Sequence, residues 1–365
     1  MNKKTIRFGF VAAAGTGLLF GLAPASAQSF PPIKTVFIIA LENHDWTQTV
    51  PEGGGGRPEQ IFGNPAAPYV NSLVNPTNPI SAQVSYATKY YNVGQGVHPS
   101  EPNYIWMEAG TEFGIHTDDD PSPEAHNVFT APHLSAQLTA AGIAWRCYQE
   151  DLEYSKSSLL SASGAGVAPN PYNGTTEYNY AVKHNPMAFF PDTQNQNCYT
   201  FKRFWTDLAE NKVGRYNWIT PDQYNEMHSS LPHGYIYHGT KFRGNQAAIA
   251  EGDNCLSIII PKIMASPAYQ DNGAIFIWTD ETVSTDDTHT TLPFIVISPL
   301  AKGHAYASDT VYTHSSVLKS MDELFGIPFQ TNAIPAEDHD AFGTGYSRVA
   351  DANDLSDLFR PTTAH

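Results

Sequence analysis

The chain has 365 residues, and its 36 acidic side chains outnumber 20 basic ones, for a formal net charge of −16. Such a negative surface disfavours nucleic acid and anionic membranes as partners, because both carry negative charge. The length suffices for one large α/β domain or two smaller ones. We expect no nucleic-acid partner, and the sequence leaves the oligomeric state open.

The first residues have the three parts of a secretory signal peptide. Basic residues come first, an apolar stretch follows, and Ala25-Ser26-Ala27 supplies the small residues of a cleavage site. We therefore predict a signal peptide over residues 1–27 and a secreted or periplasmic protein. Cleavage would remove three of the 20 basic residues and leave 17 against 36 acidic ones, a formal charge of −19.

The three cysteines, Cys147, Cys198 and Cys255, lack any C-x-x-C spacing, which argues against a structural zinc site. In an oxidising compartment we expect one disulfide and one free thiol. The sequence does not choose among the three pairings.

Residues 33–41 form a continuous apolar run rich in β-branched side chains, which predicts a strand buried on both faces. Polar groups follow at once, beginning with Glu42 and Asn43. Ligands bind at the carboxyl ends of strands in open α/β sheets, so these groups are placed for chemistry. A solvated strand end is the alternative.

A second polar segment surrounds Ser100. Pro99 and Pro102 exclude a helix interior, yet Pro102 suits a first helical turn, so the pattern predicts a loop that passes into a helix near Ser100. The N-terminus of a helix favours bound phosphate and a developing alkoxide, which suits a nucleophile. An ordinary helix cap is the other interpretation.

The middle of the chain alternates helix and strand. A predicted helix over residues 134–141 precedes a strand over 143–148, as in alternating α/β folds. Residues 155–200 have little periodicity and predict a loop-rich insertion at the sheet edge. Within it, Lys183 and His184 place a cation beside an imidazole, which suits either a phosphate site or a solvated turn.

Three potential metal ligands follow the predicted strand at residues 215–219. They are Asp222, Glu226 and His228, and three such side chains together indicate a metal site better than one alone. The segment Asp118-Asp119-Asp120, earlier in the chain, predicts a turn or a cap, with contact to the site as the alternative.

A further buried strand over residues 273–278 ends in Asp280 and Glu281. Clustered acids repel each other unless a cation is present, so a metal ion is the simplest balancing charge. Residues 294–297 predict another buried strand. The last strong helix is predicted to begin near His314. The His314 side chain would either face the site or belong only to the helix cap.

Taken in order, these segments resemble the phosphoesterase family that includes secreted acid phosphatases and phospholipases C, relatives of the alkaline phosphatase superfamily. The matching blocks are Phe37 to Asn43, His98 to Tyr104, Lys183 to Pro186, Asn225 to His228, Trp278 to Glu281 and Tyr312 to His314. The resemblance implies a single phosphoesterase domain over residues 28–365. It implies an alkaline-phosphatase-like fold, an α/β three-layer sandwich with a mostly parallel central sheet.

The resemblance also implies the roles of the site residues. Ser100 would attack phosphorus, and Asn103 would contact the phosphoryl oxygens. The remaining catalytic candidates are His98, Lys183 and His184. The candidate metal ligands are Glu42, Asn43, Ser100, Asp222, Glu226, His228, Asp280, Glu281 and His314.

The metal is left open among calcium, magnesium, manganese and zinc. Many relatives in the wider superfamily have Asp followed by His where this chain has Asp280 and Glu281. The resulting site is richer in oxygen, which weakens the case for two zinc ions.

We expect a metal-dependent phosphatase that hydrolyses small phosphomonoesters through a phosphoserine. Phospholipase C activity on phospholipids is the alternative, although no amphipathic or basic segment favours a lipid surface. A metal-independent serine hydrolase lacks its Gly-x-Ser-x-Gly motif. A secreted cation-binding module without catalysis would explain the acidic residues but not the placement of Ser100.

Overall fold

The computed structural model describes residues 30–47, 60–94, 97–152, 180–194, 196–282, 290–335 and 348–361. The predicted signal peptide and most of the predicted insertion lie outside these ranges. Among the described residues, no helix combines the length and the apolar character needed to cross a bilayer.

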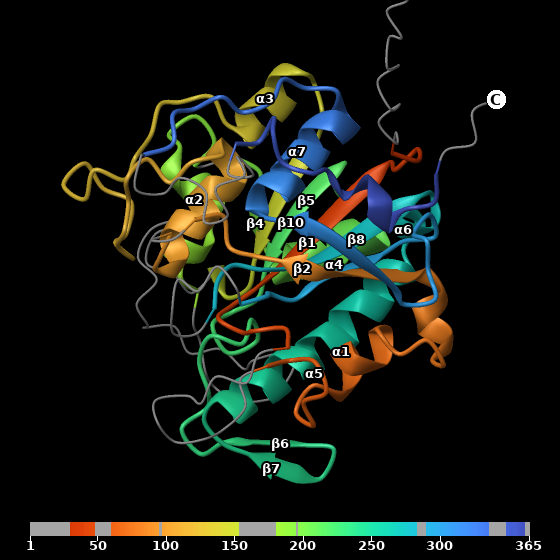
Figure 1. The fold of residues 1–365 in the computed structure, drawn as a ribbon. Helices are drawn as coiled ribbons and strands as arrows, with labels where there is room; N and C mark the ends of the chain where they lie inside the picture. Colours follow the sequence, from red (N-terminus) through yellow and green to blue (C-terminus); the bar gives the residue numbers. More distant parts are fainter. Residues whose placement is uncertain are drawn as a thin grey trace, which may run out of the picture.

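In the described part of the chain, a central eight-stranded sheet has the order β10, β2, β9, β8, β1, β5, β3, β4 (Figure 1). Its strands are Thr35–Leu41 (β1), Val84–Tyr90 (β2), Trp145–Gln149 (β3), Cys198–Thr200 (β4), Tyr216–Thr220 (β5), Gly273–Thr279 (β8), Phe294–Ile297 (β9) and Tyr306–Tyr312 (β10). β9 runs antiparallel to both of its neighbours, and the other pairs are parallel. A separate hairpin pairs Tyr235–Tyr237 (β6) with Thr240–Phe242 (β7).

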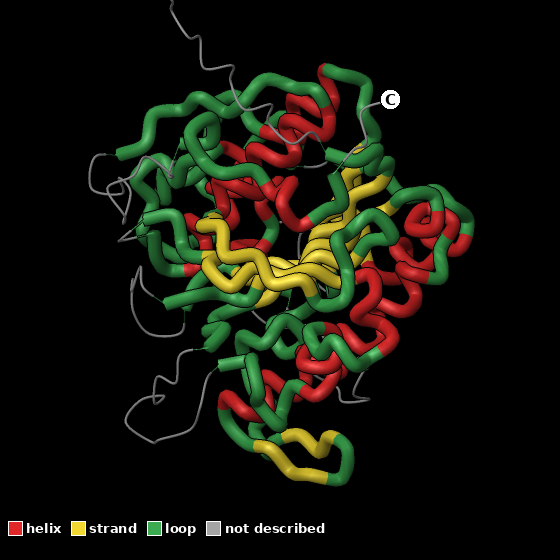
Figure 2. Tube along the Cα trace, turned by 45° about the vertical axis from the view of Figure 1, so that its right-hand side comes forward, coloured by secondary structure: helices red, strands yellow, loops and turns green. Residues whose placement is uncertain are grey.

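Helices cover both faces of the sheet (Figures 1 and 2). One face carries Pro68–Leu73 (α1), Phe201–Ala209 (α4), Asn245–Met264 (α5) and Pro267–Gln270 (α6). The other carries Ser100–Ala109 (α2), Leu134–Ala140 (α3) and His314–Phe325 (α7). The predicted α/β three-layer sandwich with a mostly parallel sheet is therefore confirmed.

The apolar run of β1 divides its side chains between the two helical layers. Phe37 and Ile39 belong to the core with α1, α4 and α5, whereas Ile38 and Ala40 belong to the core with α2 and α7. All four are 0% exposed. Because successive strand side chains point to opposite faces, a strand covered on both sides must be apolar throughout.

The helix predicted near Ser100 begins at that residue. Pro99 is its N-cap, with an extended backbone, and Gly110 ends it in the left-handed conformation at φ 69°. A Cβ at Gly110 would lie 2.8 Å from Val349 Cγ2, so glycine is required both for the turn and for the packing.

The predicted helix near His314 is α7. Thr313 and Ser316 form its capping box, and Gly326 ends it in the left-handed conformation. The other predicted strands correspond to β3, β5, β8 and β9. β2, β10 and the β6–β7 hairpin were not predicted. β4, at the end of the predicted insertion, adds an edge strand to the sheet.

All three cysteines are free thiols in this structure. Cys147 lies on β3, Cys198 on β4 and Cys255 on α5.

Candidate active site

Two acidic segments meet at the carboxyl edge of the central sheet. β1 ends at Leu41 and β8 at Thr279, and these two residues are partners in the parallel register. Glu42 and Asp280 therefore leave the sheet side by side, with the Asp280 N–H donating to Leu41 O over 3.2 Å. The Asn43 N–H donates to Asp280 Oδ1 over 3.0 Å, which ties the two segments together.

Ser100 lies between two of the carboxylates. Its Oγ–H donates to Glu42 Oε2 over 2.9 Å, and Glu281 Oε1 is 3.2 Å from the same oxygen. Ser100 is the first residue of α2 and is 1% exposed. A hydroxyl has one hydrogen to donate, so it can satisfy only one of these carboxylates at a time. Such a cluster of oxygens suits a hard divalent cation.

Tyr104 holds the other oxygen of Glu42, since its O–H donates to Glu42 Oε1 over 2.6 Å. Residues four apart lie on the same face of a helix, so α2 presents the hydroxyls of Ser100 and Tyr104 to one carboxylate. The Tyr104 ring stacks on His184 with centroids 5.0 Å apart. Sequence reasoning missed this role, although the spacing of Ser100 and Tyr104 on one helix face could have indicated it.

His314 positions Asn103 beside the carboxylates. The Trp278 indole N–H donates to His314 Nδ1 over 3.1 Å. An indole nitrogen can only donate, which places the ring hydrogen of His314 on Nε2. Nε2 lies 2.7 Å from Asp280 O and 3.2 Å from Asn103 Oδ1. Asn103 Nδ2 in turn donates to Glu281 Oε2 over 3.2 Å.

Both ring nitrogens of His314 thus contact protein groups, and burial lowers its pKa to about 3, which keeps the ring neutral. These contacts favour a positioning role for His314. Its predicted role as a metal ligand stays a prediction.

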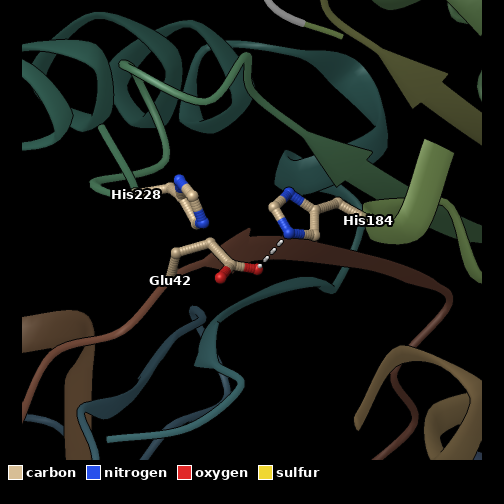
Figure 3. Close-up of side chains that lie close together, drawn as sticks. All are labelled: Glu42, His184 and His228. Atoms are coloured by element: carbon tan, nitrogen blue, oxygen red, sulfur yellow. Dashed lines mark ion pairs between the residues drawn. The ribbon is translucent and has the colours of Figure 1, made fainter. Parts of the chain in front are cut away.

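Glu42, His184 and His228 converge on one point (Figure 3). One ligand atom from each lies within 4.8 Å of the others. Glu42 follows β1, His184 ends the short 3₁₀ turn Val182–His184, and His228 follows β5 in the chain. Two imidazoles and a carboxylate are a common donor set for a divalent metal.

Glu226 orients His184. His184 Nδ1 lies 2.6 Å from Glu226 Oε1, and its Nε2 lies 3.3 Å from Glu42 Oε1. With the ring hydrogen on Nδ1, the Nε2 lone pair faces a carboxylate oxygen that already accepts from a hydroxyl. A cation relieves that repulsion, and a carboxylate behind the imidazole is the usual partner of a metal-binding histidine.

The pKa shifts in this cluster have burial as their main cause. Burial raises the pKa of Glu42 well above its ordinary value, and the Asp280 and Glu226 carboxylates raise it further. Burial raises the pKa of Asp280 to about 7. Burial also lowers the pKa of His184 well below its ordinary value and that of His228 to about 4, so both rings are neutral.

The residues present fit a bound divalent cation. Asp280 Oδ2, His184 Nε2 and Glu226 Oε2 are buried without a hydrogen-bond partner in the described part of the chain. Unpaired buried acceptors cost stability unless another group balances them. The neutral imidazole of His184 and the carboxylates of Asp280 and Glu226 supply the lone pairs that a metal needs.

Lys183 brings a positive charge to the cluster. Its ammonium pairs with Asp118 Oδ2 at 2.8 Å, while Asp118 Oδ1 accepts the Glu101 N–H over 3.1 Å. The Asp118 carboxylate therefore bridges Lys183 and the first turn of α2, a position suited to an anion. Burial would lower the pKa of Lys183, but the carboxylates of Glu42 and Asp118 raise it above its ordinary value.

His98 pairs with one of the two carboxylates that contact Ser100. Its Nδ1 pairs with Glu281 Oε2, and its side chain is 23% exposed against 6% for Glu281. His98 is therefore the more accessible partner of this pair.

Asp222 belongs to a neighbouring cluster. Its Oδ1 accepts the N–H groups of Tyr224 and Asn225 over 3.1 and 2.8 Å. Glu150 Oε2 accepts the Asp222 N–H and Asn225 Nδ2, each over 2.9 Å. Asp222 thus shapes the turn that carries Glu226, whereas Glu226 itself contacts His184. The predicted role of Asp222 as a metal ligand stays a prediction.

Residues 89–328 match the model of the Phosphoesterase family. The chain is similar to a phosphatidylinositol-3-phosphatase of Mycobacterium tuberculosis, at 24% identity over 86% of this chain and 85% of the relative. An acid phosphatase of Aspergillus fumigatus is 26% identical over 68% of this chain, and the match spans only 50% of that enzyme.

Among solved structures, the fold is similar to that of the lipoteichoic acid synthase LtaP from Listeria monocytogenes. The TM-score is 0.50 at 12% identity, and the match covers 86% of this chain and 76% of that one. At this identity the likeness bears on the fold alone.

Proposed function

Because the chain belongs to the Phosphoesterase family and is a phosphoric ester hydrolase, we propose that it hydrolyses phosphomonoesters through a phosphoserine on Ser100. The observation that carries this proposal is the Ser100 hydroxyl, held 2.9 Å from Glu42 Oε2 and 3.2 Å from Glu281 Oε1. A buried serine between two carboxylates at a helix N-terminus is placed to act as a nucleophile.

Ser100 Oγ is the attacking atom. Its hydrogen points to Glu42 Oε2, so this carboxylate is the acceptor that the structure offers for the proton. Tyr104, bonded to the other oxygen of Glu42, keeps the carboxylate turned toward the serine.

We assign five side chains to a divalent cation: Glu42, Asp280, Glu281, His184 and His228. When bound, the cation would lower the energy of the serine alkoxide and neutralise charge on the phosphoryl oxygens. Glu226 holds His184 in the neutral tautomer that leaves Nε2 available.

The phosphoryl group would meet Asn103, Lys183 and the first turn of α2. These groups donate hydrogen bonds or carry positive charge, which compensates the charge of the transferred group. His98, whose Nδ1 pairs with Glu281, is our candidate for giving a proton to the leaving oxygen. The Ser100 ester would then be hydrolysed by water in a second displacement.

We favour small soluble phosphomonoesters as substrates, and a secreted location as the leader segment predicts. Both relatives described above are phosphatases, which act on monoesters. The phosphatidylinositol-3-phosphatase extends this chemistry to a phosphate on a lipid head group. The excess of 36 acidic over 20 basic residues opposes approach to an anionic membrane.

The test is a parallel assay of purified protein on p-nitrophenyl phosphate, phosphatidylinositol 3-phosphate and phosphatidylcholine vesicles. We expect release of nitrophenol to be fastest, and we expect EDTA to abolish it until a divalent metal is restored. Adding calcium, magnesium, manganese or zinc singly identifies the metal. If diacylglycerol is released from phosphatidylcholine faster than nitrophenol from p-nitrophenyl phosphate, the activity is that of a phospholipase C and not of a phosphatase. Activity that survives EDTA would remove the metal from the proposal.

A second prediction concerns Asp118, whose carboxylate competes with phosphate for Lys183 and the Glu101 N–H. We expect Asp118→Ala to lower the inhibition constant of inorganic phosphate by about tenfold, since charge-assisted hydrogen bonds of this kind are each worth more than 1 kcal/mol. The matched control is Asp119→Ala at the exposed neighbouring position, which should leave that constant unchanged. Weaker phosphate inhibition in Asp118→Ala would mean that Asp118 positions Lys183 instead.

A further inference from the structure

Two of the three cysteines face each other across neighbouring strands. Cys147 of β3 and Cys198 of β4 are direct partners in the parallel register. Partner residues in a sheet direct their side chains to the same face, so the two thiols lie on the same side of β3 and β4. Neighbouring strands lie about 4.8 Å apart, which is inside the range of about 4.4–6.8 Å for Cα atoms joined by a disulfide.

Cys255 lies elsewhere. It belongs to the core that includes α5, whereas Cys147 and Cys198 belong to the core on the opposite face of the sheet. The sheet therefore separates Cys255 from the other two sulfur atoms. Cys255 is 0% exposed as well, so reagents in solution reach it poorly.

Cys198 is the accessible member of the pair. β4 is the last strand of the sheet, so one of its edges has no strand beside it in the described chain. Cys198 is partly exposed, whereas Cys147 is 0% exposed and is held by Gln149, whose Nε2 donates to its sulfur over 3.2 Å. An external oxidant would thus meet Cys198 first.

From these positions we infer that Cys147 and Cys198 form a disulfide bond in an oxidising medium, leaving Cys255 as a free thiol. A low-molecular-weight disulfide such as oxidised glutathione is the oxidant. The Cys198 thiolate attacks one glutathione sulfur and releases one glutathione. The Cys147 thiolate then attacks the Cys198 sulfur and releases the second, and the two protein protons pass to the two glutathione thiolates.

The bond would close a loop over residues 147–198, which includes Lys183 and His184. Closing a loop of this length restricts the unfolded chain and raises the melting temperature when the native geometry accepts the bond. We expect a rise of about 5 °C or more on oxidation, reversed by dithiothreitol. This inference does not depend on the proposed function, because its readouts require no turnover.

The experiment begins with fully reduced protein, incubated with oxidised glutathione under native conditions and then denatured for thiol counting. We expect three thiols before oxidation and one afterwards, together with a non-reducing peptide map that joins Cys147 to Cys198. Cys255→Ser should keep the cross-link and the rise in melting temperature. Cys198→Ser, at the partly exposed position, should abolish both.

Three results would overturn the inference. They are an unchanged count of three thiols, a cross-link that includes Cys255, and a stable glutathione adduct on Cys198 without closure. The peptide map distinguishes all three. If the reduced protein unfolds in a cooperative thermal transition, failure to form the disulfide is not due to misfolding.

Discussion

We expect Ser100→Ala to reduce turnover of p-nitrophenyl phosphate by at least about a thousandfold, because the nucleophile that forms the covalent intermediate is removed. The fold should persist, since one hydroxyl with a net hydrogen-bond contribution of about 1 kcal/mol is lost. The measurement is kcat with metal content and melting temperature determined on the same preparation. Rapid acid quenching with a ³²P-labelled substrate should trap a phosphoprotein from wild type and none from the variant.

The matched control is Ser257→Ala on α5, where the hydroxyl donates to the backbone oxygen of Asn254 over 2.7 Å. This variant should retain wild-type turnover and the phosphoprotein. Activity of Ser100→Ala within about tenfold of wild type would exclude Ser100 as the nucleophile, whatever the metal content.

The second large effect is expected at Glu42. Glu42→Gln keeps the shape of the side chain and removes the charge that faces Ser100, His184 and the neighbouring acids. Loss of a partner behind a metal ligand costs about 10–100-fold in affinity, so we expect loss of a ligand itself to cost more. Elemental analysis after dialysis should find little metal, and turnover should fall with it. Asp280→Asn should behave in the same way.

Asp253→Asn is the control for a buried carboxylate that serves the fold. Asp253 accepts the N–H groups of Tyr69 and Val70 at the start of α1, and burial raises its pKa to about 6. The change should reduce stability while metal and activity remain. Equal metal content in Glu42→Gln and wild type would remove Glu42 from the metal site.

The strands that composition indicates best, β1 and β8, are covered by both helical layers. β1 and β8 are apolar at almost every position, so composition alone indicates them. β2 and β10 mix polar and apolar side chains, because they lie toward an edge of the sheet where burial is less complete. Such segments do not differ in composition from polar loops, which explains why they were missed.

The acids of the site were predictable because each follows a buried strand. That Glu42 and Asp280 touch depends on β8 being the neighbour of β1, and strand order is set by packing across the whole sheet. The bridge from Lys183 to Asp118 joins residues 65 positions apart in two irregular segments. No periodic pattern connects such segments, so sequence reasoning could name both of them but could not pair them.

The register of β1 has a consequence for how the protein acquires activity. β1 lies between β5 and β8, and the hydrogen bond from Asn43 to Asp280 joins residues 237 positions apart in the sequence. A chain emerging from the ribosome therefore holds Glu42 without its neighbour Asp280 until β8 has been made. Contacts of such long sequence separation form slowly, because the intervening chain must be ordered first. Recovery of turnover during refolding should accordingly lag behind helix formation and report completion of the sheet.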